Sequence, residues 1–242
     1  MDGGEKQSFG KIGIDGTMVY TIPYNNISAV VSDTPLREYE PSEANALAHE
    51  KVVEYVMQKH MVLPLGFGNI FINENRVEWL LTKFYRTFRI YLKKLEGKVE
   101  IGVKVFYDLE TARRNIENTN DEIKRLKEVL ASEHLKEDQF SREKLVAAIA
   151  RKFVEEVSKK AYEYGVRIYE VLGKVAVESR LMKRISDDMI MNGTFLVNKD
   201  KIGQFEKTLE TLRGEYEKQG LIFQLSGPWP PYNFAHIKIG NT

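Results

Sequence analysis

Apolar residues recur with two different periods along this chain, and the change from one period to the other limits the possible fold more than any other feature of the sequence. In "VEIGVKV", residues 99–105, every second residue is apolar, which places four apolar side chains on one face of a strand. Between residues 73 and 95 the apolar residues are three and four apart, as on one side of a helix. The pattern therefore predicts an α+β fold.

The N-terminal part predicts a complete module. "GTMVYTIPYNNISAVVSD", residues 16–33, indicates a hairpin, and a helix follows from Ser42, its expected N-cap, to about residue 60. "VLPLGFGNIFI", residues 62–72, predicts two short extended pieces around a tight bend. With the helix at 73–95 and a strand at 99–108, the order is strand, helix, strand, strand, helix, strand. That is the order of a ferredoxin-like (split βαβ) unit.

A long helical hairpin is expected in the middle of the chain. After Asp108, a good N-cap, the apolar residues thin to a narrow seam that suits one partner helix. "SEHLKEDQFS", residues 132–141, breaks the run, and Ser141 can cap the next helix. No Gly/Ser-rich or Pro-rich linker occurs, so the hairpin itself is expected to join the two halves.

The last third of the chain predicts a second small α+β unit. Residues 189–198 indicate a strand, 199–220 a helix and 221–227 another strand, whereas residues 171–187 fit either a helix end or a strand. We therefore expect two modules of ferredoxin-like character joined by the hairpin. The predicted domains are an N-terminal α+β domain, residues 1–108, and a C-terminal domain, residues 109–242.

Charge and composition argue against several classes of partner. The 36 Lys and Arg residues nearly balance the 35 Asp and Glu residues and are interleaved with them, so nucleic acid is not an expected partner. There is no cysteine, which excludes disulfides, thiolate metal sites and cysteine nucleophiles. Apolar runs are short and the first ten residues are polar, so we expect a cytoplasmic protein without a membrane span or signal peptide.

Catalytic signatures are absent from the sequence. The phosphate-binding motifs GxxxxGK[ST] and GxGxxG, the zinc motif HExxH and the nucleophile motif GxSxG do not occur. His49 and Glu50 fit a capping or packing pair better than a catalytic dyad, because no nucleophile lies near them. Gly66 and Gly68 flank Phe67 and predict a tight turn, with close approach to a ligand as the alternative. We therefore expect no catalytic residue, no metal site and no cofactor.

The segment "GPWPPYNF", residues 227–234, combines three prolines with three aromatic residues and carries no charge. Its prolines exclude a helix or a central strand. The segment either completes the core of its own chain or presents aromatic side chains to another protein, and both interpretations stay open. The candidate residues are Trp229, Pro230, Pro231, Tyr232 and Phe234.

The same segment resembles the C-terminal signature of the gas vesicle protein F/L family. Three more blocks follow the family order: "AHEKVVEYVMQKHMVLPLGFG" at 48–68, "GKVEIGVKVF" at 97–106 and "NGTFLVNKDKIGQFE" at 192–206. The first block contains the family-motif candidates His49, Glu50, Pro64, Phe67 and Gly68.

This resemblance implies a non-enzymatic protein of gas vesicle formation, built from two α+β modules and found in the cytoplasm and at the gas vesicle. It also implies that the protein binds the small, hydrophobic main shell protein and other gas vesicle proteins, either as an assembly factor or as a minor structural component. A soluble partner with sheet edges and exposed aromatic residues can cover apolar surfaces that otherwise aggregate.

A rival hypothesis is a small-molecule-binding or enzymatic α+β protein with a pocket at Gly66–Gly68, His49 and Tyr232. A deep polar pocket that unites these residues would favour the rival, and a flat apolar surface would count against it.

Overall fold

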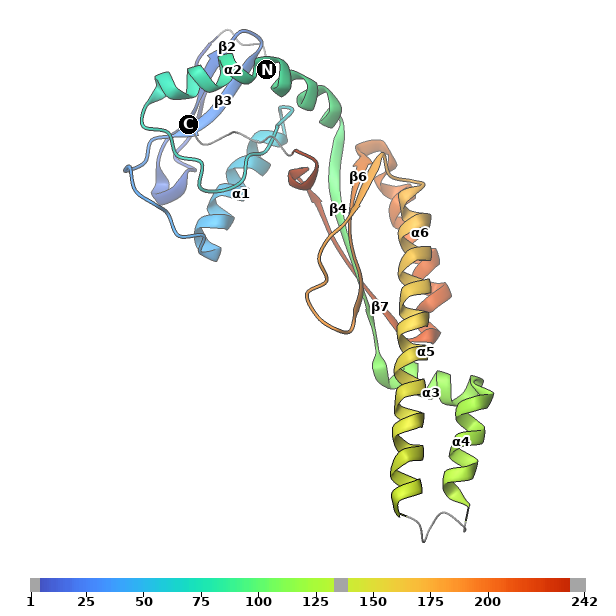
Figure 1. The fold of residues 1–242 in the computed structure, drawn as a ribbon. Coiled ribbons are helices and arrows are strands. Elements are labelled where there is room, and N and C mark those ends of the chain that lie inside the picture. The colour runs from blue at the N-terminus through green and yellow to red at the C-terminus, as the bar shows by residue number, and fades with distance from the viewer. Residues whose placement is uncertain (1–4, 133–138, 236–242) are drawn as a thin grey trace. The chain divides into compact units, whose positions relative to one another are not determined.

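The computed structural model describes residues 5–132 and 139–235, which form two compact units (Figure 1). The first unit joins Met1–Glu100 to Pro228–Thr242, and the second is Ile101–Gly227. The sequence placed the division between residues 108 and 109, at the end of a strand. In the structure strand β4 (Lys98–Tyr107) begins in the first unit and continues in the second. The C-terminal tail then returns to the first unit.

A small antiparallel sheet forms one layer of the first unit. It has three strands in the order β1 (Ser8–Gly10), β2 (Val19–Tyr24), β3 (Ile27–Ser32). The predicted hairpin is β2 and β3, closed by a two-residue turn in which Asn25 adopts φ 51°. Asparagine tolerates this left-handed conformation better than most residues, which explains why the short turn closes here.

Two predicted helices complete this unit, and each begins at a capped residue. At the start of α1 (Glu43–Met57) the Ser42 side chain accepts a hydrogen bond from the Asn45 N–H. At the start of α2 (Glu74–Leu95) the Asn73 side chain accepts one from the Arg76 N–H. The apolar face of α2 packs on the sheet. The main core cluster is Ile27, Leu80, Leu81 and Phe88.

The segment between α1 and α2 contains no strand, so the ferredoxin-like order expected at residues 27–107 is wrong there. Pro64 has no N–H to donate, and Gly68 turns the chain with φ +94°. The carbonyl groups of Leu65 and Gly66 bond to side chains of His49 and Asn69 rather than to a neighbouring strand. In addition, β3 and β4 belong to different sheets.

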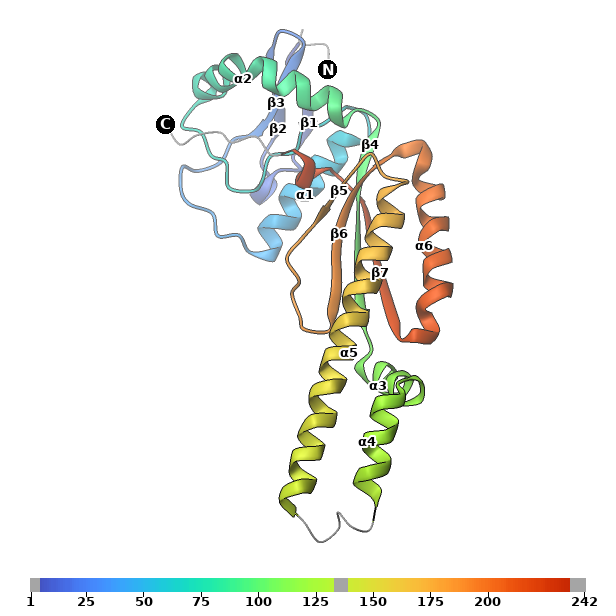
Figure 2. The same ribbon diagram turned by 45° about the vertical axis from the view of Figure 1, so that its right-hand side comes forward.

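The second unit contains a four-stranded sheet in the order β5-β6-β4-β7. Both α5 and α6 contact β6 and each other, so they cover the same face of this sheet (Figure 2). Along the chain the order is strand, helix, strand, strand, helix, strand, with a helical insertion after the first strand. The elements are β4, α5 (Gln139–Gly173), β5 (Glu178–Leu181), β6 (Met189–Asn198), α6 (Ile202–Tyr216) and β7 (Leu221–Trp229).

The insertion confirms a helical hairpin but divides its first arm. Both arms lie within the second unit, so the expectation that the hairpin joins the two units is wrong. The chain breaks at Asn120 into α3 (Leu109–Thr119) and α4 (Asp121–Ala131), because the Asn120 side chain accepts a hydrogen bond from the Ile123 N–H and starts a new helix. Helix α4 packs along α5. The expected cap at Ser141 is wrong, since α5 is already helical at Gln139. Most of the break predicted at 132–141 lies outside the described residues.

The stretch that the sequence left open contains both alternatives. Helix α5 ends at Gly173, and Glu178–Leu181 pairs with β6 as the edge strand β5. The predicted strand at 221–227 extends two residues further, through Pro228 and Trp229. Proline is tolerated there because β7 is also an edge strand.

Candidate functional site

The tail that follows β7 is held in the first unit by a buried carboxylate. Glu100 in β4 is only 6% exposed. One of its oxygens accepts a hydrogen bond from the main-chain N–H of Asn233 at 2.9 Å, and the other accepts one from the Asn233 side-chain amide. Charge-assisted hydrogen bonds of this kind are stronger than neutral ones, so this pair determines where the tail lies.

The three tail aromatics have three different environments. Phe234 is fully buried, whereas Trp229 at the end of β7 remains 38% exposed. Tyr232 lies between these extremes, and Pro230 and Pro231 are buried. The core-completing interpretation therefore describes Phe234, while only Trp229 offers substantial aromatic surface to another molecule.

The hydroxyl of Tyr232 is buried and meets no hydrogen-bond partner among the described residues. Burial, together with the negative charges of Glu50 and Glu54 in α1, raises the pKa of Tyr232 to about 12. Ionisation of this phenol is unfavourable beside two acids. Tyr232 is therefore a neutral side chain near α1, which does not suit a general base at ordinary pH.

His49 joins α1 to the glycine-containing bend. Its Nε2 lies 2.9 Å from the carbonyl oxygen of Leu65, and its ring meets Phe67 edge to face with centroids 6.0 Å apart. The Asn69 amide donates to the Gly66 carbonyl at 2.6 Å. These contacts explain why His49, Phe67 and the bend occur together in one sequence block. They give His49 a structural role, which is to hold the bend against α1.

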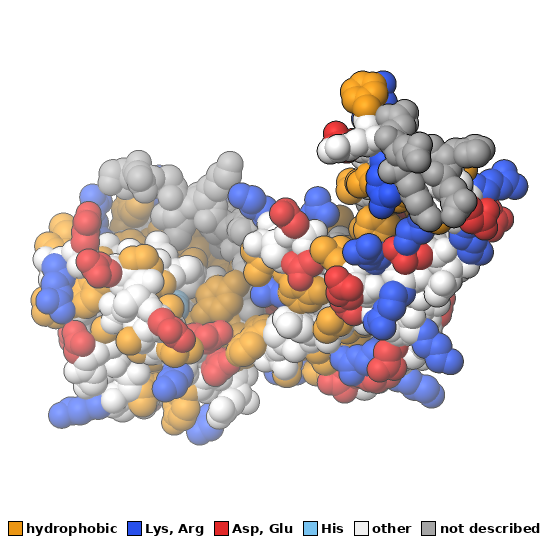
Figure 3. Space-filling model, turned by 90° about the horizontal axis from the view of Figure 1, so that it is seen from below, with side chains coloured by type: hydrophobic (Ala, Val, Ile, Leu, Met, Phe, Trp, Pro, Cys, Tyr) orange, Lys and Arg blue, Asp and Glu red, His pale blue; other side chains and the backbone are white. Residues whose placement is uncertain are grey.

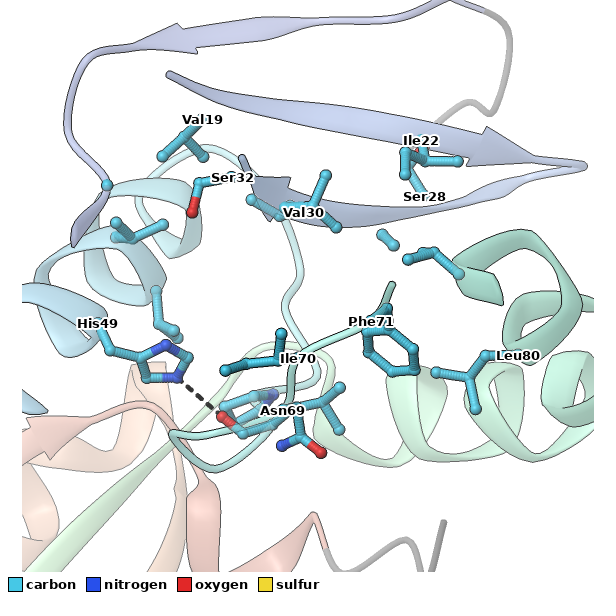
Figure 4. Close-up of a pocket in the computed structure, with 18 of the residues that line it drawn as sticks. Val19, Ile22, Ser28, Val30, Ser32, His49, Asn69, Ile70, Phe71 and Leu80 are labelled. Carbon is cyan, nitrogen blue, oxygen red and sulfur yellow. Dashed lines mark hydrogen bonds between the residues drawn. The ribbon is translucent and has the colours of Figure 1, made fainter. Parts of the chain in front are cut away.

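A cavity of about 460 Å³ lies in the first unit, between β3, α1, the segment 61–73 and α2. Figure 4 shows His49, Ile70 and Phe71 facing β3 across it. Its volume falls within the range of roughly 300–1,000 Å³ that is typical of small-ligand sites. Among the described residues that line it, none is Lys or Arg.

One end of the cavity carries its two acids. The Tyr20 hydroxyl oxygen lies 2.9 Å from Asp33 and 3.0 Å from Glu74, so its one proton is shared between two carboxylate acceptors, and burial together with these bonds raises the pKa of Tyr20. The Lys6 ammonium lies 3.0 Å from Glu74, which lowers the pKa of that carboxyl. The acids at this end are thus already engaged within the protein.

The structure brings the predicted residues into two groups rather than one. His49, Pro64, Phe67 and Gly68 line the cavity, but Tyr232 is not among the lining residues. The pocket of the rival hypothesis therefore exists in part, with mainly apolar walls. Sequence reasoning missed Glu100 and Asn233, although a lone acid between the buried residues of an alternating strand is a signal for Glu100.

Within the described part of the chain, no three His, Cys, Asp or Glu side chains lie close enough together to hold a metal ion. Within residues 5–132 and 139–235, every helix is too short or too polar to cross a bilayer. On the face seen in Figure 3, acidic and basic side chains are interspersed.

Comparison with known protein families identifies the family to which this sequence is similar. The profile of the family described as "Gas vesicle synthesis protein GvpL/GvpF" matches residues 1–236. The chain belongs to the GvpL/GvpF family. This membership makes it a gas vesicle protein by descent, in agreement with the resemblance of its four sequence blocks.

Individual GvpF and GvpL proteins are similar over nearly the whole chain. Gas vesicle protein F1 of Halobacterium salinarum is 26% identical over 225 residues, covering 92% of this chain and 83% of that protein. Gas vesicle protein F of Haloferax mediterranei is 27% identical, with coverages of 92% and 84%. Gas vesicle protein L of a Streptomyces species is 23% identical over 246 residues, covering 94% of this chain and 87% of that protein.

Solved GvpF structures share the fold. The crystal structure of GvpF from Anabaena sp. PCC7120 matches with a TM-score of 0.80 at 23% identity, covering 96% of this chain and 93% of that one. GvpF from Microcystis aeruginosa gives a TM-score of 0.72 at 22% identity, with coverages of 95% and 93%. The mixed helix and strand architecture is therefore common to GvpF proteins from different organisms.

Proposed function

We propose that this protein supports gas vesicle formation by binding the hydrophobic main shell protein and other gas vesicle proteins, and that it does so without catalysis. The observation that carries the proposal is the match of the GvpL/GvpF family over residues 1–236. Its site of action, by the same argument, is the cytoplasm and the gas vesicle.

The tail supports a binding role through Trp229. A tryptophan that is 38% exposed beside the prolines of an edge strand offers rigid aromatic surface at low entropic cost. Tryptophan is also among the residues that most often dominate binding energy at protein interfaces. We therefore propose Trp229 as the tail residue that contacts a partner, while Phe234 fixes the tail to its own unit.

Co-expression of the tagged protein with the main shell protein and the accessory gas vesicle proteins tests this proposal. The shell protein or an accessory protein is expected to co-purify with the full chain. The Trp229→Ala variant should recover less of it, while Trp79→Ala, which removes an exposed tryptophan from α2, serves as a matched control. Failure to recover any gas vesicle protein with the wild-type chain would contradict the proposal.

Small-molecule binding has one observation in its favour, the cavity of about 460 Å³. Its polar groups, however, are mostly engaged within the protein, as for His49 with Leu65 and Asn69 with Gly66. An enzyme needs convergent polar groups that are available to a substrate. The cavity is therefore better suited to apolar contact than to chemistry.

A further inference from the structure

Strand β3 has an open edge. It lies at the end of the sheet order β1-β2-β3, so β2 is its strand neighbour among the described residues. The Thr21 N–H donates to the Gln7 carbonyl at 2.9 Å, on the side of β1, and Thr21 lies opposite Val30 in the register of β2 and β3. In an antiparallel pair of this type neither residue bonds to the other, so the N–H and C=O of Val30 point away from β2.

The backbone N–H and C=O groups of every second residue of β3 point in this same direction, away from β2. Ser28, Val30 and Ser32 therefore present their N–H and C=O groups at the free edge. All residues from Ile27 to Thr34 line the cavity, which means that this edge opens onto it. Figure 4 shows Val30 and Ser32 on one side of the space and Ile70 and Phe71 on the other.

The edge lacks the features that usually prevent pairing with another strand. Natural proteins protect exposed edges with lysine, proline, inward charges or bulges. The sequence of β3, "ISAVVS", has no charge and no proline, and its register with β2 continues without a bulge from Ser32 to Ile27. A free, uncharged edge beside an apolar wall combines the two requirements of β-strand addition, which are main-chain hydrogen bonds and pockets for alternate side chains.

We propose that the cavity binds an extended, apolar segment of another polypeptide, which adds to the free edge of β3 as a fourth strand. The segment is about five residues long, because outward groups from Ser28 to Ser32 span about five positions at roughly 3.3 Å each. Its side chains alternate, with apolar residues directed toward Ile70 and Phe71. The segment belongs to a different protein and not to a second copy of this chain, and the inference goes beyond the proposed function, since it holds whichever different protein supplies the segment.

Strand addition explains the site better than a small ligand does. Backbone donors and acceptors that have no partner among the described residues, and that repeat every second residue, match the spacing of another strand. The described residues of the cavity wall include no Lys or Arg to attract an anion, and the acids Asp33 and Glu74 at one end are hydrogen-bonded to Tyr20. A neutral peptide backbone with apolar side chains satisfies both the edge and the walls.

A displayed library of heptapeptides, selected against the full chain, provides the test. Peptides with alternating apolar residues are expected to be enriched. Val30→Pro removes the outward N–H but leaves the ladder with β2 intact, because edge strands accept proline at such positions. Val30→Ala is the matched control, since it shortens the side chain and keeps the N–H. The enriched peptide should bind Val30→Pro at least about fivefold more weakly than Val30→Ala.

A second arm uses the wild-type chain and therefore does not depend on the folding of a variant. The enriched peptide is synthesised with N-methyl groups on alternate residues, in both possible phases. One phase deletes the donors that face β3 and should lose binding, while the other phase should retain it.

Four results would overturn the proposal. The first is a selection that enriches no peptide with alternating apolar residues. The second is equal affinity of the enriched peptide for Val30→Pro and Val30→Ala, and the third is equal affinity of the wild-type chain for the two N-methylated peptides. The fourth is a different occupant, seen either as binding of the apolar fluorophore N-phenyl-1-naphthylamine that the peptide does not displace, or as a dimer of the full chain that Val30→Pro dissociates.

Discussion

Asn233 donates two hydrogen bonds to Glu100, one to each carboxylate oxygen, across 133 positions of sequence. The donors are its main-chain N–H and its side-chain amide. Because Glu100 is 6% exposed, water contributes little to the solvation of this carboxylate. The tail is thus part of the folding of the first unit rather than an appendage to it.

Asn233→Ala should lower the free energy of unfolding by about 1.5–3 kcal/mol, the usual range for a hydrogen bond to a charged group. Urea unfolding at neutral pH measures this loss. Asn75→Ala, at an exposed position of α2, is the control and should change stability by no more than about 0.5 kcal/mol. Equal effects of the two substitutions would mean that the Glu100 contact does not hold the tail.

Phe234 and Trp229 should separate stability from binding. Phe234→Ala removes a fully buried ring and is expected to cost about 3–5 kcal/mol in unfolding free energy. Trp229→Ala removes a ring that is 38% exposed, so a clearly smaller loss is expected, together with reduced capture of gas vesicle proteins. Thermal unfolding and co-purification are the two measurements. Unchanged capture by the Trp229 variant would remove this residue from the proposed contact.

Tyr232 should make the protein sensitive to alkaline pH. Its pKa is raised to about 12, so the folded state holds the phenolic proton more tightly than the unfolded chain does. The associated stability is complete below about pH 10 and is lost as pH rises from about 10 to 12. Urea unfolding at a series of alkaline pH values measures this loss.

The Tyr232→Phe variant should lose less stability over that range than the wild type. Burial also raises the pKa of Tyr107 to about 12, so a residual alkaline loss remains in the variant. At neutral pH the substitution should stabilise the fold by about 1 kcal/mol, because it removes a buried hydroxyl that has no partner among the described residues. Tyr162→Phe, at a tyrosine that is 74% exposed, is the control. A variant with the alkaline profile of the wild type would contradict this account.

His49→Phe should loosen the segment between α1 and α2. The substitution keeps a ring beside Phe67 but deletes the hydrogen bond to Leu65, at a cost of about 1 kcal/mol. Hydrogen exchange of residues 61–73 is expected to accelerate. His60→Phe is the matched control, since His60 also meets a ring edge to face, that of Phe9. Similar exchange in both variants would argue against a role for the His49 bond.

The two glycines of the bend should respond differently to alanine. An added Cβ meets open space at both Gly66 and Gly68, but only Gly68 has a positive φ, +94°. Gly68→Ala should therefore destabilise the protein by about 1–2 kcal/mol through backbone strain. Gly66→Ala should be neutral or stabilise it by up to about 1 kcal/mol. Thermal unfolding of the two variants checks this, and the reverse order would exclude strain as the cause.

Local features of the fold were predictable because their causes are local. Ser42 and Asn73 cap the helices that the periodicity indicated, and β4 follows the alternation of residues 99–105. The helix break at Asn120 was missed, although asparagine is a good cap, because the apolar seam continues across it.

Pairing between distant segments was not predictable from the same patterns. Alternation in β4 shows that one face is buried but not which strands lie beside it, and its neighbours β6 and β7 come from the last third of the chain. The strand, helix, strand, strand, helix, strand order was therefore assigned to residues 27–107, whereas the structure has it from β4 to β7.

The candidate site shows the same limit. His49, Phe67 and Gly68 are near one another in sequence, and their association was predictable. The partnership of Glu100 and Asn233 depends on a long return of the chain. The free edge of β3 could not be inferred either, because an edge is defined by the strand that is missing beside it.

The discontinuous first unit imposes an order on biosynthesis. Residues 228–235 leave the ribosome only after all of residues 101–227, yet they supply the buried ring of Phe234 and the donors for Glu100. Domains generally fold as units during synthesis, beginning from the N-terminus. Here the first unit cannot be completed until the second unit has been synthesised. The surface that Phe234 later covers is therefore exposed on the nascent chain during that time.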